Sequence, residues 1–197
     1  ALAVSCSKDK DHARISFDQT SVYFGWDDTK TVSFSSSNVK SYSVSTKPTG
    51  WVDPVIDADA KTMKITSPVE GDEDAVQSGT LTIAGISYDG KVVTASIFVS
   101  ISETVDLSAE PANSYIVNRK QTNYLFDAMH KGDGKSSLET ASVKVIWQTR
   151  SSLIQYLSLS DGKASFYVGA NDDDELVEGN ALIGAYDAAG NLLWSWH

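Results

Sequence analysis

The sequence contains few cysteines, histidines and prolines: one, three and four, respectively, in 197 residues. Cysteine and histidine are the two of these that would point most directly to a reaction. One cysteine excludes an internal disulfide, and no histidine lies at metal-ligand spacing from another histidine or from the cysteine. A glycine-rich phosphate loop and a nucleophile elbow are also missing. Paired carboxylates stay open, because they need only converge in space. We therefore expect that the protein binds no cofactor and is not an enzyme.

Basic residues are outnumbered, and long apolar runs are missing. The 16 lysines and arginines against 26 acidic residues give a formal net charge of -10. Such a charge repels phosphate backbones, so nucleic acid is not expected as a partner. No apolar run reaches the length of about 18 residues that a membrane-spanning helix needs. The composition, 41% hydrophobic and 21% charged, is typical of a folded globular protein.

Apolar and polar residues alternate in short runs from Ile15 onward. Ile15 and Phe17, then Val22 and Phe24, follow the two-residue period of a half-buried strand. The same alternation recurs in TVSFSS, YSVST, KTMKITS, GTLTIAG and KVVTASIFVSIS. About seven short strands separated by turn residues predict an immunoglobulin-like β-sandwich.

A second series of strands begins after the break at ETVDLSAEP. Its expected strands are SYIVN, NYLFDAM, SVKVIWQT, LIQYLSLS, KASFYVG, ALIGAYD and NLLWSWH. LSDGKA and YDAAGNL predict hairpin turns, whereas SSLIQYL is also compatible with a single helical turn. We therefore expect an all-β protein of two tandem immunoglobulin-like β-sandwich modules. The first spans residues 14–103 and the second 104–197, behind a tether at 1–13.

The single cysteine lies near the start of the chain. Cys6 follows the small apolar stretch LAVS and precedes the polar run SKDKD. This arrangement resembles a bacterial lipoprotein signal followed by the tether of a surface-exported lipoprotein of Bacteroidetes. The resemblance implies a lipid anchor at Cys6 and a surface-exposed position in the outer membrane. The alternative is the remnant of a cleaved signal peptide with no lipid.

Two further resemblances concern the strand regions. Trp51, KITSPVEGDEDAVQSGTLTI and VVTASIFVSIS resemble the BACON-type sandwich modules of gut Bacteroidetes surface proteins. PANSYIV and EGNALIGAYDAAGNLLWSWH resemble a C-terminal β-module of Bacteroides cell-surface lipoproteins and fimbria-associated proteins, in which the closing strand continues past this histidine. We accordingly expect the natural chain to extend beyond His197. The resemblances imply glycan binding or spacing in a glycan-utilisation system. The alternative is a structural or accessory subunit of a surface appendage.

Aromatic side chains are the candidates for sugar contacts, because the apolar face of a sugar ring stacks on an aromatic ring. Trp26 belongs to the turn FGWDDTK. With Tyr23, Asp27 and Asp28 it is expected to form a glycan-facing patch; the alternative is a turn aromatic packed over the sandwich end. The remaining tryptophans lie in strand patterns and are expected to be buried: Trp51, Trp147, Trp194 and Trp196.

Acidic residues gather in the loops NDDDELVEGN and EGDED. Carboxylate oxygens suit calcium, so Asp172, Asp173 and Asp174 are a weak calcium candidate. Their spacing is not that of an EF-hand, and a solvated surface loop is the alternative. The partners expected are a glycan, other surface proteins and, through the lipid anchor alone, a membrane.

Overall fold

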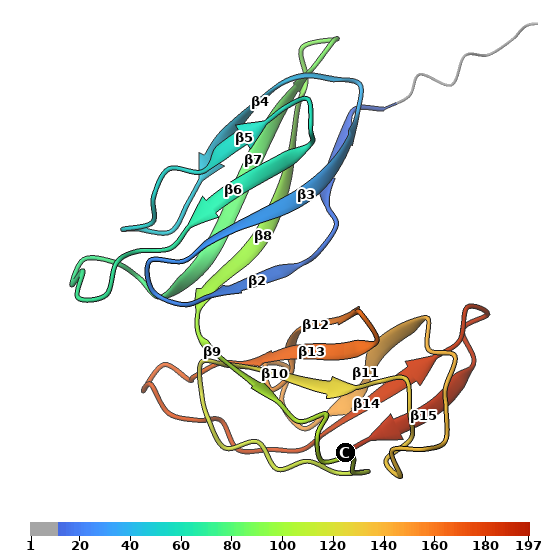
Figure 1. Ribbon diagram of the computed structural model, residues 1–197. Coiled ribbons are helices and arrows are strands. Elements are labelled where there is room, and N and C mark those ends of the chain that lie inside the picture. Colours follow the sequence, from blue (N-terminus) through green and yellow to red (C-terminus); the bar gives the residue numbers. More distant parts are fainter. Residues whose placement is uncertain (1–11) are drawn as a thin grey trace, which may run out of the picture. The chain divides into compact units, whose positions relative to one another are not determined.

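The computed structural model describes residues 12–197, which form fifteen β-strands and no helix (Figure 1). These residues divide into two compact units. One runs to Val99, and the other comprises Ser100–His197 together with Tyr23–Gly25. The all-β prediction is confirmed. The module boundary expected between residues 103 and 104 stays a prediction, and Cys6 lies outside the described residues. Within the described part, no helix is long and apolar enough to cross a membrane.

The first unit is a β-sandwich of two four-stranded sheets (Figure 1). In one sheet the strand order is β1-β3-β6-β5, and in the other it is β2-β8-β7-β4. The strands of the first sheet are Arg14–Phe17 (β1), Thr29–Ser37 (β3), Thr62–Thr66 (β6) and Val55–Asp57 (β5). Those of the second are Ser21–Phe24 (β2), Val92–Ile101 (β8), Ser78–Ser87 (β7) and Val39–Thr46 (β4).

Alternate residues of these strands supply the core of the first unit. Val32 and Phe34 of β3 are buried, as are Met63 and Ile65 of β6. Their neighbours in sequence are exposed or half-buried, which is the two-residue period that the sequence predicts. Trp51, which is 1% exposed, also belongs to this core, and its indole Nε1 donates a hydrogen bond of 2.9 Å to the Val76 carbonyl.

The second unit contains a four-stranded sheet and a three-stranded sheet, with strand orders β12-β13-β10-β9 and β11-β14-β15. The strands of the larger sheet are Gln155–Ser160 (β12), Lys163–Val168 (β13), Thr122–Asp127 (β10) and Glu103–Asp106 (β9). Those of the smaller sheet are Ser142–Gln148 (β11), Ala181–Tyr186 (β14) and Leu192–Trp196 (β15). β9 pairs with β10 in parallel, whereas the other neighbouring strands of these two sheets are antiparallel.

Aromatic rings from both sheets meet in the core of the second unit. Phe126 of β10 lies 4.9 Å from the ring of Trp196 and 6.3 Å from that of Phe166, measured between ring centroids. All three side chains belong to one buried cluster. Because its members come from β10, β13 and β15, this cluster joins the two layers into a sandwich.

Two local predictions for the second unit have different outcomes. The hairpin at LSDGKA is confirmed: Asp161 and Gly162 have φ values of 51° and 75°, the left-handed geometry that a tight hairpin requires. The prediction of a strand at SYIVN is wrong. Within this segment, the N–H of Tyr115 donates a hydrogen bond of 2.9 Å to the His197 carbonyl, just after the end of β15. A strand needs a partner along its length, and the following residues have none among those described.

We expect Trp51→Ala to lower the free energy of unfolding of the first unit by about 3–5 kcal/mol, because it leaves a cavity in the core and removes the donor to Val76. Urea denaturation followed by circular dichroism measures the change. Tyr88→Ala, which removes an exposed ring, is the control and is expected to change stability by less than about 0.5 kcal/mol. Equal effects of the two substitutions would contradict this view of the core.

Candidate functional site

The solvent-facing side of the β11-β14-β15 sheet carries a group of aromatic and apolar side chains. Ile183 and Ala185 of β14 point into the core and are buried. Residues between and beside them therefore face outward. We call the outward group the aromatic face; its members are Lys144, Ile146, Trp147, Leu182, Gly184, Tyr186, Leu192 and His197.

A β-bulge brings Trp147 onto this face. The register between β11 and β14 shifts between Val145, paired with Ile183, and Trp147, paired with Leu182. Ile146 is therefore an extra residue, and a bulge of this kind re-aims the side chains that follow it. Trp147 is 44% exposed, so its predicted burial is wrong. Strict alternation would have put it on the core side with Val145.

The neighbours of Trp147 combine apolar surface with polar groups. The His197 ring lies 5.9 Å from the Trp147 ring, and Lys144 Nζ lies 5.0 Å from the ring centroid of Tyr186. At Gly184 an added Cβ would come within 3.0 Å of the side chains of Ile146, Tyr186 and Leu192. Glycine thus lets these side chains cover the middle of the sheet. The result is an aromatic surface flanked by an ammonium and an imidazole group.

The other strand tryptophans are less exposed. Trp51 and Trp196 are buried, as the strand pattern predicts. Trp194 is half-buried, and Lys131 Nζ lies 4.8 Å above its ring. Of the four tryptophans expected to be buried, Trp147 is the one that presents a large exposed ring.

The turn that carries Trp26 is tied to the segment after β6. Asp27 N donates to the Pro68 carbonyl at 2.8 Å, and Asp28 N donates to Ser67 Oγ at 2.9 Å. Asp27 has a φ of 51°, which is unusual for a residue other than glycine. Trp26 is half-buried and Asp27 exposed, so the turn presents part of an indole beside one solvated carboxylate.

The remaining members of the predicted patch contribute less exposed surface. Tyr23 lies in β2, between the buried Val22 and Phe24, and is half-buried. Asp28 is also half-buried and forms an ion pair of 3.7 Å with Lys30. The patch at Tyr23, Trp26, Asp27 and Asp28 stays a prediction.

Tyr88 is a second exposed aromatic that the sequence did not single out. It lies in the turn between β7 and β8 and is 75% exposed. Lys91 N donates to Ser87 Oγ at 2.8 Å, and Lys91 forms an ion pair of 2.9 Å with Asp89. These bonds hold the turn in one conformation. A tyrosine in a turn carries no sequence signal that separates it from an ordinary surface residue.

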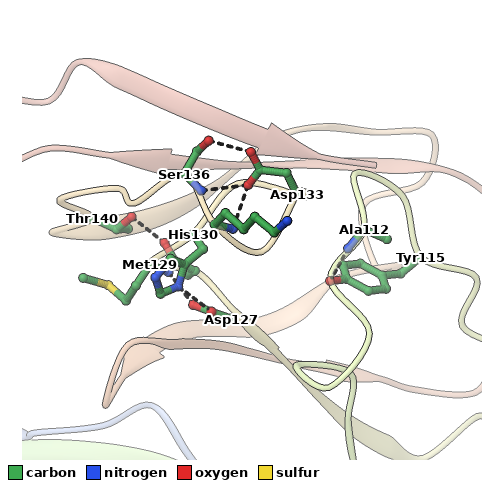
Figure 2. Close-up of polar contacts among 10 residues, drawn as sticks. Ala112, Tyr115, Asp127, Met129, His130, Asp133, Ser136 and Thr140 are labelled. Carbon is green, nitrogen blue, oxygen red and sulfur yellow. Dashed lines mark hydrogen bonds and ion pairs between the residues drawn. The ribbon is translucent and has the colours of Figure 1, made fainter.

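Figure 2 shows the polar network that closes the loop between β10 and β11. Asp127 accepts a hydrogen bond of 2.7 Å from Met129 N and lies 2.7 Å from His130 Nδ1. Thr140 Oγ1 donates to the Ala128 carbonyl at 2.5 Å. A histidine beside a carboxylate is a familiar acid–base arrangement, but Asp127 also fixes the loop backbone here. We therefore interpret the contact between Asp127 and His130 as one that stabilises the loop between β10 and β11.

The calcium candidate lies in the loop before β14. Asp172, Asp173 and Asp174 are exposed, and Asp174 forms an ion pair of 2.5 Å with Lys120. Asn171 Oδ1 accepts hydrogen bonds from the backbone N–H groups of Asp173 and Glu175. Among residues 12–197, no group of three or more His, Cys, Asp or Glu side chains is arranged to hold a metal ion. The structure thus does not bring the three aspartates together.

Comparisons with known proteins identify no family. No family model matches the sequence, and no curated protein matches it. Several solved structures align with the chain at low identity and with TM-scores below 0.5, which is too low to support an inference about function.

Three of these solved structures come from different kinds of protein. The first is SGBP-B of the Bacteroides ovatus mixed-linkage glucan utilization locus, in complex with a mixed-linkage heptasaccharide. It is 18% identical, with a TM-score of 0.22, and the alignment covers 87% of this chain and 38% of that one. The second, protocadherin gamma B2 extracellular cadherin domains 3–6, is 13% identical with a TM-score of 0.33, covering 89% and 47%. The third, SporoSAG from Toxoplasma gondii, is 11% identical with a TM-score of 0.23, covering 92% and 96%.

The loop network predicts a measurable acid titration. The Ser136 hydroxyl, followed by the backbone N–H groups of Ser136 and Lys135, lowers the pKa of Asp133 to about 2. Because the pKa is lower in the folded state than the usual value of about 3.9, the stabilisation is present above about pH 4 and is lost as the pH falls toward 2.

We expect an NMR titration of the Asp133 carboxyl to have its midpoint near pH 2. Asp133→Asn should reduce the protection of the loop amides from hydrogen exchange at neutral pH and abolish its acid dependence between about pH 4 and 2. Asp59→Asn, in the first unit, is the control and should leave these amides unchanged. A midpoint near pH 4 would contradict the network.

Proposed function

We propose that this chain is a non-catalytic, carbohydrate-binding protein of the bacterial cell surface, and that the aromatic face is its sugar contact. The observation that carries the proposal is the bulge at Ile146, which turns Trp147 to the solvent. An exposed tryptophan is costly to retain for stability alone, because its large apolar ring gains most from burial. Contiguous exposed apolar patches mark binding surfaces, and Trp147 shares the aromatic face with the exposed side chains of Ile146 and Leu192.

The chemistry of the aromatic face suits a sugar ring. The C–H groups on one side of a pyranose are apolar and stack on an indole, whereas its hydroxyl groups need hydrogen-bond partners. Trp147 supplies the indole. The His197 ring, whose centroid lies 5.9 Å from that of Trp147, supplies a polar group beside the indole, and Lys144 supplies an ammonium group over the Tyr186 ring of the same face. Leu182, paired with Trp147 across the sheet, extends the apolar area beneath a bound ring.

The net charge of the chain narrows the class of glycan that it is expected to bind. At a formal charge of -10 the chain repels sulfated and uronic-acid-rich polymers at long range. A neutral glycan of plant, host or microbial origin is therefore the favoured ligand. Its binding should depend little on salt, because stacking and hydrogen bonds between neutral groups are not screened.

The proposal also covers the cellular location of the protein and the role of its first unit. Anchoring through Cys6 to the outer membrane, with the modules exposed at the surface, rests on the lipoprotein-like sequence around that residue. The first unit then acts as a BACON-like spacer that holds the second unit away from the membrane. The turn with Trp26 and Asp27 is a second, weaker sugar contact within this scheme.

We expect residues 12–197 to bind a neutral glycan on an array, and Trp147→Ala to weaken that binding by about tenfold or more because it removes the stacking surface. Trp147→Tyr, which keeps an aromatic ring, should retain part of the affinity. Tyr88→Ala is the matched control, since it removes an exposed ring from the other unit. Circular dichroism verifies that each variant is folded.

The outcome of Trp26→Ala separates the two proposed contacts. If the aromatic face is the principal site, this variant keeps most of the affinity that Trp147→Ala loses. Loss of binding in Trp26→Ala alone would move the site to the first unit. Absence of binding to every neutral glycan tested would contradict the carbohydrate role and favour that of a spacer or appendage subunit.

A further inference from the structure

The turn between β7 and β8 carries an exposed apolar surface at one end of the first unit. Ser87 N donates to the Lys91 carbonyl at 2.8 Å, and Gly90 N donates to the Ser87 carbonyl at 3.0 Å. Ser87 and Lys91 are therefore opposite each other. The next pair along the two strands is Ile86 and Val92, which lie on one face of the sheet and are 42% and 66% exposed. We call residues 86–92 the hairpin tip.

Tyr88 adds a large exposed ring to the hairpin tip. It is 75% exposed, and it lines one hollow together with Val92. Gly90 has a φ of 83°, and no atom of the described residues beyond its chain neighbours lies within 4 Å of the position that a Cβ would take there. The turn therefore projects into the solvent. Contiguous apolar and aromatic side chains on a projecting turn gain little from the fold, and such patches mark interaction sites.

The described chain enters the first unit at the same end. His12 and Ala13, just before β1, line the same hollow as Tyr88 and Val92. Figure 1 shows the start of the described chain, in blue, at the end of the unit where β7 and β8 are joined. Cys6 precedes His12 by six residues, a stretch that spans at most about 20 Å in any conformation. A lipid on Cys6 would therefore hold the hairpin tip close to the membrane surface.

A lysine lies beside the apolar pair of the hairpin tip. The register between β4 and β7 shifts between Val39, which pairs with Ser87, and Ser41, which pairs with Ile86. Lys40 is therefore the extra residue of a bulge next to Ile86. Its side chain is exposed and forms no ion pair among the described residues. A lysine in this position can lay its apolar stem along the patch and extend its ammonium group toward lipid headgroups.

The charge near the hairpin tip is opposite in sign to that of the whole chain. Arg14, at the start of β1, is exposed and also forms no ion pair within residues 12–197. Lys91 and Asp89 form an ion pair of 2.9 Å and cancel each other. The turn at residues 57–61 carries two aspartates, but it bonds to β3 three residues before that strand ends. Arg14 and Lys40 thus leave two positive charges at this end of a chain whose formal net charge is -10, and basic groups near a membrane surface strengthen binding to anionic lipids.

From this arrangement we infer that the hairpin tip docks on the surface of a lipid bilayer. Ile86, Tyr88 and Val92 then lie at the boundary between headgroups and acyl chains, where a tyrosine keeps its hydroxyl group in water. Arg14 and Lys40 lie among the headgroups. The inference rests on the lipid anchor of the proposed function, but it assigns a contact surface and an orientation of the first unit that glycan binding does not require.

The anchor makes a small apolar surface sufficient. Three side chains bind a bilayer weakly when the chain is free in solution, since the affinity follows the apolar area that is buried. Attachment of the chain through a nearby residue turns docking into an intramolecular step with a high effective concentration. The hairpin tip therefore docks when the chain is anchored and stays largely undocked when the chain is free.

The test anchors the full chain chemically, because Cys6 is its one cysteine and reacts selectively with a maleimide lipid. The chain, with labelled isoleucine and valine methyl groups, is coupled to nanodiscs of phosphatidylcholine and phosphatidylglycerol that contain a spin-labelled lipid. We expect the spin label to broaden the methyl signals of Ile86 and Val92. The signals of Val69, an exposed valine in the loop before β7, should stay sharp because β7 separates that loop from the hairpin tip by about 30 Å.

Two matched pairs of variants test the contact, with docking followed through the Ile86 methyl signal. Val92→Asp places a charge in the apolar surface and should weaken docking by about tenfold or more, whereas Val69→Asp should leave it unchanged. Lys40→Gln should weaken docking by about fivefold on nanodiscs that contain phosphatidylglycerol and have no effect on phosphatidylcholine alone. Lys64→Gln, which changes an exposed lysine of β6, is its control. Circular dichroism verifies that each variant is folded.

Several results would overturn the inference. These are equal broadening of Val69 and Val92, and unchanged docking of Val92→Asp. A contact of the hairpin tip with residues 1–11 that persists on nanodiscs would also overturn it. Self-association of the lipid-free chain through Ile86 and Val92 would replace the bilayer by a second copy.

The outcome is separate from that of the glycan proposal. Chemical coupling does not depend on lipidation by the cell, and glycan binding is not measured, so a failure to dock leaves the sugar contact unaffected. Mass spectrometry of the natural protein tests whether Cys6 carries a lipid. Its absence would remove the anchor on which this inference rests, whatever the result of the glycan array.

Discussion

The two-residue repeat of the β-strand is the constraint on which this structure depends. Each strand has one side that faces the core and one that faces the solvent, so a residue's position in the repeat decides whether its side chain is buried or exposed. Val32 and Phe34 reach the core because they are two apart, and Ile183 and Ala185 do so for the same reason. With no helix and no disulfide among the described residues, burial along these repeats and backbone pairing hold both sandwiches together.

The proposed sugar contact lies where that regularity is interrupted. The extra residue at Ile146 moves an indole from the core side to the solvent side, at the cost of locally disturbed pairing with β14. The regular parts of the sandwich thus provide rigidity, and its irregular parts provide the surfaces that a ligand or partner can use.

Much of the fold could be predicted from the sequence, because strand alternation and turn chemistry are local. The strands of the first unit and the hairpin at Asp161 and Gly162 are examples. The candidate site was less predictable. A bulge depends on the partner strand, so nothing within SVKVIWQT shows that Trp147 leaves the repeat. SYIVN has the composition of a strand, but a strand also needs a neighbour, and the sequence alone does not supply one.

The bonds from His197 to Asn113 and Tyr115 also bear on the order of events during synthesis. All eight strands of the first sandwich have left the ribosome once Ile101 has emerged, so that unit can fold while translation continues. The second sandwich joins residues that are far apart in the sequence. Its core aromatic Trp196 is synthesised long after Phe126, and until then Phe126 and its neighbours have no cover on that side. The apolar side chains of β10 and β13 are therefore exposed to misassembly while β15 is still being made.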